Sequence, residues 1–499
     1  MALGGGLWYE PCRTFHDPRL EGRGGVISEE DRVRRRVWRR IAPLWLVVGL
    51  LFTPVLSGCA TSGALDPSSA ASGKAKNVVL LIGDGMGPSH IWASWLYSNR
   101  VLGKNLKMIE IMNAGHTAYL VNDAADAIVT ESAAAASQIA TGQRMTTGAL
   151  SMAADGKTPV KTVMEIAKAK GLATGLVTTS GITDATPAAF AVHVAHRSDE
   201  ISVADQELTF GVDVLMGGRK QFFLPEVSAG KRTDGRNLLD EARAAGYAVV
   251  GDAEELRVAA GPRILGLFHM GNMAHEIDRS VTMEPSLAEM TAKTLQALSQ
   301  TPSGFFAMIE GGRIDHAAHR NDAAGMIHDT LAFDEAIGVV QEFARKNPNT
   351  LVIVTADHET AGLALISPSK ESKADIGIDV TTIRKAKASF EVIADALGQD
   401  PTPKQVQQVV KTYLDIEITD DEARTVANDT IRKLDPAHYG YLFLHSLAFV
   451  LRPYLGVSWG SQSHTASPLL VFGMGPGSER LRGLLHNTQL FDIMKSAVE

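Results

Sequence analysis

Three apolar runs in this chain each end in acidic residues, and this pattern constrains the fold more than any other feature. The runs and the residues that follow them are Asn77–Gly83 with Asp84, Phe305–Ile309 with Glu310, and Leu351–Ala356 with Asp357 and His358. Continuous apolar runs of this length predict strands that are buried on both faces of a parallel sheet. Ligand sites in such sheets lie beyond the carboxyl ends of the strands, so these side chains should meet at one edge.

Carboxylates gathered at one edge of a sheet repel one another unless cations lie among them. Asp315 and His319, just beyond the second run, are four residues apart. On a helix this spacing places both side chains on one face, where they can hold one metal ion. The pair alone is weak evidence, because exposed helix faces carry similar pairs. Together with the three strand ends, it predicts a multi-metal hydrolase.

Strand and helix patterns alternate from Asn77 onward, which predicts an α/β fold with a mostly parallel central sheet and helices on both faces. The further predicted strands are 173–178, 212–216, 247–250 and 469–472, and the predicted helices are 160–169, 284–298 and 323–345.

The pattern changes between residues 367 and 456, where helices are predicted at 402–414, 419–434 and 439–455. We expect a helical insertion here, serving as a lid or as a homodimer contact. The catalytic domain is then formed by residues 77–366 and 457–499, and the insertion precedes its last part.

The first 58 residues predict an export signal rather than part of the fold. A basic segment, 34–40, precedes an apolar segment, 41–55, that is short for a membrane span. The next four residues, Leu56-Ser57-Gly58-Cys59, resemble a bacterial lipoprotein box, with cleavage before Cys59 and a lipid on its thiol. An uncleaved signal anchor is the alternative. Residues 59–76 would then tether an enzyme that faces the periplasm or the cell exterior to a membrane.

The charge balance argues against nucleic acid as a partner. The chain has 48 basic and 56 acidic residues, a net charge of −8, and therefore no general basic footprint. An acidic enzyme that handles an anion needs strong local positive charge, which metal ions supply. The cysteines are Cys12 and Cys59, and the expected cleavage and lipidation would leave no thiol for a disulfide.

Thr130, Glu131 and Ser132 precede an alanine-rich run that predicts a helix. Backbone N–H groups and the helix dipole at such a helix start favour anions and lower the cost of forming an alkoxide. Ser132 is therefore a candidate nucleophile, although a serine at this position can also act only as a helix cap.

Five segments, taken in order, resemble the signature segments of alkaline phosphatases. They are Ile82–Gly87, Thr130–Ala134, Asp184–Ala189, Glu310–His316 and Thr355–Thr360. The resemblance covers residues 76 to 365 and then 460 to the C-terminus. It implies the fold of that family and a phosphomonoester hydrolase (EC 3.1.3.1) that uses two zinc ions and one magnesium ion.

The resemblance also implies a role for each site residue. The implied ligands are Asp315, His319 and His464 for one zinc, Asp84, Asp357 and His358 for the other, and Asp84, Thr186 and Glu310 for magnesium, with Asp184 acting there through water. Ser132 would attack phosphorus and form a phosphoserine. Arg197 would bind the phosphate, since its planar guanidinium makes two parallel hydrogen bonds to phosphate oxygens.

Two residues depart from the family pattern. Glu131 stands where the family commonly has aspartate. Because its side chain is one methylene longer, the sequence does not decide whether it makes the usual contact with Arg197. His316 occupies a variable position near magnesium and phosphate. It would either tune the pH optimum or metal preference, or only support neighbouring groups through a hydrogen bond.

Two other functions compete with a phosphomonoesterase. A phosphodiesterase or another phosphoryl-transfer enzyme of the same superfamily would share the metal ligands, but Arg197 and the segment around Asp184 favour a terminal phosphate, hence phosphate monoesters. A lipid-anchored phosphate-binding protein would need no nucleophile, so Ser132 argues against it.

Overall fold

The computed structural model describes residues 74–366, 380–429 and 444–499. The strands of its central sheet, in chain order, are β1 (Asn77–Gly83), β2 (His116–Val121), β3 (Ala173–Gly181), β4 (Val214–Gly218), β5 (Ala248–Val250), β6 (Ile264–Leu267), β7 (Phe305–Gly311), β8 (Thr350–Thr355), β13 (Leu469–Met474) and β14 (Gly483–His486). In space they follow the order β14-β2-β13-β8-β1-β7-β3-β4-β6-β5. The strand β13 runs antiparallel to β8 and β2, and the other neighbouring pairs are parallel.

The three apolar runs form adjacent central strands, which confirms the predicted mostly parallel fold. Strand β1 lies between β7 and β8, and every residue of the three strands is buried. The register pairs Ile82 with Glu310 on one side and with Thr355 on the other. The carboxyl ends of the three strands therefore lie level with one another, and the acidic residues that follow them emerge at one edge.

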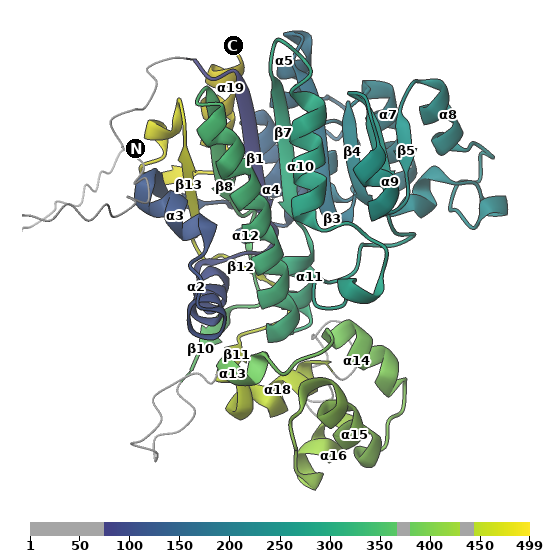
Figure 1. Cartoon of the computed structure of the whole chain (residues 1–499), viewed down its shortest axis with the longest axis vertical. Helices are drawn as coiled ribbons and strands as arrows, with labels where there is room; N and C mark the ends of the chain where they lie inside the picture. The colour runs from purple at the N-terminus through teal and green to yellow at the C-terminus, as the bar shows by residue number, and fades with distance from the viewer. Residues whose placement is uncertain (1–73, 367–379, 430–443) are drawn as a thin grey trace, which may run out of the picture. The chain divides into compact units, whose positions relative to one another are not determined.

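Helices cover both faces of this sheet (Figure 1). The helices α10 (Leu287–Leu298) and α12 (Ala323–Lys346) pack together on one face, and α4 (Ser132–Thr141), α5 (Val163–Ala169) and α19 (Gln489–Val498) pack together on the other. Both α5 and α10 begin with a capping box, in which the cap hydroxyl and a glutamate three residues later satisfy free backbone N–H groups.

The catalytic part contains further helices and short strands. They are α2 (Pro88–Tyr97), the π-helix η2 (Ser98–Leu102), α3 (Lys107–Ala114), α6 (Ala185–Ala188), α7 (Glu200–Phe210), α8 (Leu238–Ala244), α9 (Ala253–Val258), α11 (Arg313–His319), β9 (Glu359–Thr360), β10 (Leu363–Leu365), β11 (Val457–Trp459) and β12 (His464–Thr465), with 3-10 turns η3 (Lys220–Phe223), η4 (Glu226–Ser228), η5 (Arg279–Val281) and η6 (Ser478–Arg480).

The chain between β10 and β11 is helical in its described residues and has a small core of its own. Its helices are α13 (Val380–Ile383), α14 (Phe390–Leu397), α15 (Pro403–Leu414), α16 (Asp420–Ala427) and α18 (Leu444–Leu455). Ile393 of α14, Val406 of α15 and Leu447 of α18 are fully buried and belong to this core. The helix predicted at 419–434 ends earlier, at Ala427, because Asp429 takes a left-handed backbone conformation. A lid or dimer role for this insertion stays a prediction.

The predicted leader, Cys59 and most of the predicted tether lie outside the described residues. Across the ranges that the structure does describe, the helices are too short or too polar to span a bilayer. Residues 430–434 and 439–443 of the predicted insertion helices also fall outside these ranges.

Candidate active site

Three buried carboxylates lie at the edge of the sheet where β1, β7 and β8 end. Asp84 and Asp357 lie just beyond β1 and β8, and Glu310 is the penultimate residue of β7. Burial, followed by repulsion from neighbouring carboxylates, raises the pKa of Asp84 well above its ordinary value and that of Asp357 to about 7. Burial raises the pKa of Glu310 to about 8. Such a cluster is unfavourable in its charged form unless cations neutralise it.

One candidate metal group consists of Asp84, Asp357 and His358, whose ligand atoms lie within 4.8 Å of one another. The Nε2 atom of His358 lies 3.5 Å from Asp84 Oδ1 and 3.2 Å from Asp357 Oδ2. Neither oxygen accepts a hydrogen bond from any described residue. Buried oxygens without a donor are costly, and a cation among them would remove that cost. Imidazole and carboxylate ligands in this arrangement suit zinc.

The second group consists of Asp315, His319 and His464. Asp315 and His319 lie one turn apart on α11, and pairing of β12 with β9 brings His464 beside them. His319 Nδ1 lies 2.6 Å from the carbonyl oxygen of Gln462, and His464 Nδ1 lies 3.1 Å from that of Thr130. A carbonyl oxygen can only accept, so both Nδ1 atoms carry the proton and donate it. The two Nε2 atoms lie 3.0 Å apart. With the proton on Nδ1, each neutral ring has a free lone pair on Nε2, which is what a metal ligand requires.

The residues expected around magnesium share one buried region. Burial is the main cause of the raised pKa of Glu310 and of Asp84; the charge of Asp184 adds to the first and the charge of Glu310 to the second. Thr186 lies on α6 and is buried, and Asp184 caps that helix. Thr178, which the sequence did not single out, donates a short hydrogen bond to Glu310 Oε2.

Asp184 is engaged on both oxygens. Its Oδ1 accepts from Arg197 Nη2 at 2.8 Å, and its Oδ2 accepts from Arg219 Nη2 at 2.9 Å and from Ser180 Oγ at 2.8 Å. Burial opposes ionisation, but Arg219 and Arg197 together lower the pKa of Asp184 far below its ordinary value. Asp184 is therefore an anion that holds two arginines in place.

Ser132 is the first residue of α4 and is buried. Its Oγ lies 3.3 Å from His358 Nε2, which places the hydroxyl beside the first metal group. Glu131 is the helix cap, with an extended backbone, and four alanines after Ser132 favour helix and let α4 pack closely. The local sequence thus fixes the serine at a helix start and next to the metal ligands.

The contact between Glu131 and Arg197, which the sequence left open, is present in the structure. Glu131 Oε2 accepts from Arg197 Nη1 at 2.7 Å and from the backbone N–H of Ala133 at 2.9 Å. Its Oε1 accepts from the N–H groups of Ala134 and Gly148 at 2.8 and 2.9 Å. Although burial acts against it, Arg197 lowers the pKa of Glu131, so the side chain is an anion with four donors.

Arg219 is a further positive residue that the sequence analysis missed. It follows β4 directly and has a left-handed backbone with φ 59°. Its Nη2 donates to Asp184, and its Nη1 donates to Glu200 at 2.8 Å. The strand-end rule that located Asp84 could have found it, since Arg219 also follows the carboxyl end of a strand.

His316 lies beside the site but belongs to neither metal group. Its Nδ1 faces Arg313 Nη1 at 2.9 Å, and burial and Arg313 lower its pKa well below the ordinary value. A guanidinium can only donate, so Nδ1 accepts and His316 is a neutral ring with its proton on Nε2.

These groups line a cavity of about 520 Å³. Its walls are formed by Val129, Thr130, Glu131, Ser132, Asp184, Arg197, Arg219, Asp315, His316, His319, Ser463 and His464. The nucleophile candidate, two arginines and one metal group therefore open into the same space.

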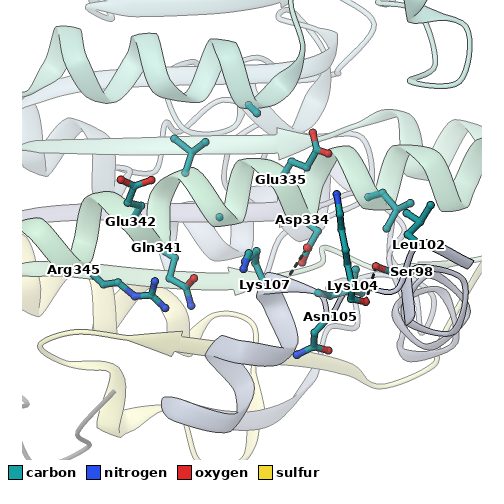
Figure 2. A pocket seen from close by; sticks show the side chains of 15 residues that line it. Ser98, Leu102, Lys104, Asn105, Lys107, Asp334, Glu335, Gln341, Glu342 and Arg345 are labelled. Atoms are coloured by element: carbon teal, nitrogen blue, oxygen red, sulfur yellow. Dashed lines mark hydrogen bonds between the residues drawn. The ribbon is translucent and has the colours of Figure 1, made fainter. Parts of the chain in front are cut away.

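A larger cavity of about 760 Å³ lies between η2, α3 and α12, and Figure 2 shows its mixed lining of charged and apolar side chains. Asp334 in its wall accepts from the backbone N–H groups of Lys107 and Met108, both at 2.8 Å, and thereby caps α3. None of the predicted catalytic or metal-binding residues lines this cavity. Chemistry rather than size identifies the active site.

A serine at a helix start, metal-binding groups beside it and arginines in the same cavity define a metal-dependent hydrolase for an anionic ester. The chain belongs to the alkaline phosphatase family, whose model matches residues 75–499. The protein is therefore a phosphatase that binds metal ions and acts on phosphate monoesters.

Similarity to individual relatives extends over most of the chain. Alkaline phosphatase 4 of Bacillus subtilis is 32% identical over 463 residues, which cover 90% of this chain and 95% of the relative. The crystal structure of Thermus thermophilus alkaline phosphatase is 32% identical and superposes with a TM-score of 0.78, covering 89% of this chain and 95% of that one. An alkaline phosphatase variant from the Antarctic bacterium TAB5, solved with magnesium bound in its M3 site, is 25% identical, with a TM-score of 0.62 and coverage of 85% and 98%.

Proposed function

We propose that this protein is an exported alkaline phosphatase that hydrolyses phosphate monoesters through a phosphoserine at Ser132, with two zinc ions and one magnesium ion. The observation that carries the proposal is the 3.3 Å distance between Ser132 Oγ and His358 Nε2. It places the hydroxyl of the first residue of α4 beside an expected zinc ligand. No described contact favours a diester or a purely binding function.

The proposed metal ligands are those implied by the family resemblance. Asp315, His319 and His464 would hold one zinc, Asp84, Asp357 and His358 the other, and Asp84, Thr186 and Glu310 the magnesium. Magnesium in the TAB5 relative supports the third ion. Bound zinc would lower the pKa of a hydroxyl or water and offset charge on the reacting oxygens.

In the proposed reaction, Ser132 Oγ gives its proton to solvent and attacks phosphorus in line with the leaving oxygen, which takes up a proton from water as the alcohol departs. The Ser132–phosphorus bond forms as the ester bond breaks. Water then attacks the phosphoserine, phosphate leaves, and the hydroxyl of Ser132 is restored. Arg197 binds two phosphate oxygens during both steps, because Glu131 and Asp184 hold its guanidinium in one orientation.

The proposal is tested by hydrolysis of p-nitrophenyl phosphate from pH 6 to 11, with zinc and magnesium measured on the same samples. Alkaline-optimum release of phosphate that stops on chelation supports it. Protein with a full metal complement that cleaves bis-p-nitrophenyl phosphate faster than the monoester would favour a diesterase instead.

Export through a lipid on Cys59 is a separate part of the proposal and needs its own test. Labelling of cells with a radioactive fatty acid should mark the wild-type protein and should not mark Cys59→Ser. Equal labelling of the two proteins would contradict lipidation at this residue.

Replacing Glu131 by aspartate should weaken phosphate binding more than metal binding. The shorter side chain cannot keep all its bonds to Ala133, Ala134, Gly148 and Arg197, and the backbone bonds fix where the carboxylate lies. We expect the inhibition constant of inorganic phosphate to rise by about tenfold, which corresponds to the loss of one charge-assisted hydrogen bond. Zinc content should stay at the wild-type level. Unchanged phosphate inhibition would show that the bond to Arg197 does not orient it.

A further inference from the structure

The insertion contacts the active-site helix α11 at the start of α14. The backbone N–H of Ser389 donates to Asp278 Oδ1 at 3.0 Å, and the N–H of Phe390 donates to Asp322 Oδ2 at 2.6 Å. Asp322 also caps α12, three residues after α11 ends. The start of α14 is therefore held against the turn between α11 and α12.

Glu391, the next residue, brings a carboxylate to three positive or basic side chains. Its Oε2 lies 2.5 Å from Arg313 Nη2, 3.3 Å from His275 Nε2 and 3.5 Å from Arg320 Nη2. Arg313 is 3% exposed and His275 is 1% exposed. A guanidinium this deeply buried needs a nearby anion, because an unpaired buried charge is costly.

Two of the three residues that meet Glu391 belong to α11, which also carries two metal ligands: Arg313 is its first residue and Arg320 is its C-terminal cap. Arg313 and Arg320 are seven residues apart, two turns of helix, and both face α14. Asp315 and His319, between them in sequence, face the second metal group. Any rotation of α11 that follows the loss of Glu391 would therefore move both metal ligands.

A second contact from the insertion reaches the same metal group by another route. His445 Nδ1 in α18 donates to Asn321 Oδ1 at 2.7 Å. Asn321 Nδ2 in turn donates to the Ser461 carbonyl at 2.8 Å. The neighbouring carbonyl, that of Gln462, orients His319. Asn321 has a left-handed backbone with φ 56°, a conformation that needs such support.

We propose that the insertion positions the zinc ligands Asp315 and His319, and that Glu391 is the positioning residue through which it acts. This inference rests on the proposed metal site. Among the described residues, the insertion contributes no side chain to the wall of the 520 Å³ cavity. The insertion thus acts on the site through α11, from outside the cavity.

The test compares Glu391→Gln, which removes the charge, with Glu391→Asp, which keeps it. Glu417→Gln is the matched control, because Glu417 is another insertion carboxylate, 83% exposed and 3.2 Å from Lys411 Nζ. Loss of zinc to a chelator is followed in all three proteins and the wild type. Hydrogen exchange of residues 313–320 is measured on the metal-free proteins.

We expect Glu391→Gln to lose zinc about tenfold faster than wild type, as when a group that orients a metal ligand is removed. Exchange in α11 should also be faster, kcat should fall more than KM changes, and Glu391→Asp should recover part of each effect. Glu417→Gln should match the wild type. A lower melting temperature with unchanged zinc loss and unchanged α11 exchange would overturn the proposal, because a merely stabilising contact gives that result. Zinc loss and exchange are read without substrate, so they remain informative even if monoester hydrolysis fails.

Discussion

Ser132→Ala should lower kcat for phosphate monoesters by at least about three orders of magnitude, the scale at which removal of a nucleophile leaves only binding and electrostatic effects. The reason is that Ser132 Oγ supplies the oxygen that bonds to phosphorus. Zinc and magnesium content should not change, because Ser132 belongs to neither metal group. Steady-state kinetics and metal analysis on the same preparation check both expectations.

Ser137→Ala provides the matched control for this variant. Ser137 lies on the same helix, is buried, and donates its hydroxyl to the Ala149 carbonyl at 3.2 Å. Its loss should lower stability while most activity remains. If Ser132→Ala kept activity comparable to Ser137→Ala, the nucleophile would have to be another group, such as water.

Removing the metal ions should abolish activity and should make folding stability fall as the pH rises. In the metal-free protein the folded-state pKa of Asp357 is raised to about 7 and that of Glu310 to about 8, chiefly by burial. In the unfolded chain these carboxyls have pKa values of about 4. Between these limits the folded protein binds more protons than the unfolded chain, so the free energy of unfolding decreases with increasing pH.

Urea unfolding of the metal-free protein between pH 5 and 9 measures this dependence. We expect the decrease to be largest between pH 5 and 8 and to be removed when zinc and magnesium are restored, because the ions bind the ionised carboxylates. Glu310→Gln, with one titrating group fewer, should show a shallower decrease. A free energy of unfolding that stays level or rises from pH 5 to 8 would contradict the account of the buried cluster.

The sheet edge could be predicted from sequence because its physical basis is local. The runs that form β1, β7 and β8 are almost entirely apolar, which predicts central strands, and parallel pairing aligns their carboxyl ends. The strands β2, β6 and β14 of the central sheet were not predicted. The strands β2 and β14 lie at one side of the sheet, where Tyr119 and Leu484 are exposed, and β6 and β14 have only four residues each, too few for a clear apolar run.

Other parts of the site depend on geometry that the residue pattern does not contain. Whether Glu131 reaches Arg197 depends on how its side chain folds back over the start of α4, and one extra methylene does not decide that. Glu391 meets Arg313 across 78 residues of sequence, through an insertion whose motifs indicate helices and nothing about their contacts. Asp184 was expected near magnesium. Its pairing with Arg219 depends on β4 lying beside β3 in the sheet, which the residue pattern does not specify.

Rapid acid quenching during turnover, followed by mass spectrometry of the peptide that contains Ser132, tests the central claim most directly. Acid stops hydrolysis of a phosphoserine, which is stable at low pH. The account predicts phosphate on Ser132 in the wild-type protein, its absence in Ser132→Ala, and its absence after the metal ions are removed. Turnover of a phosphate monoester with Ser132 unmodified at every quench time, or with phosphate on another residue, would contradict it.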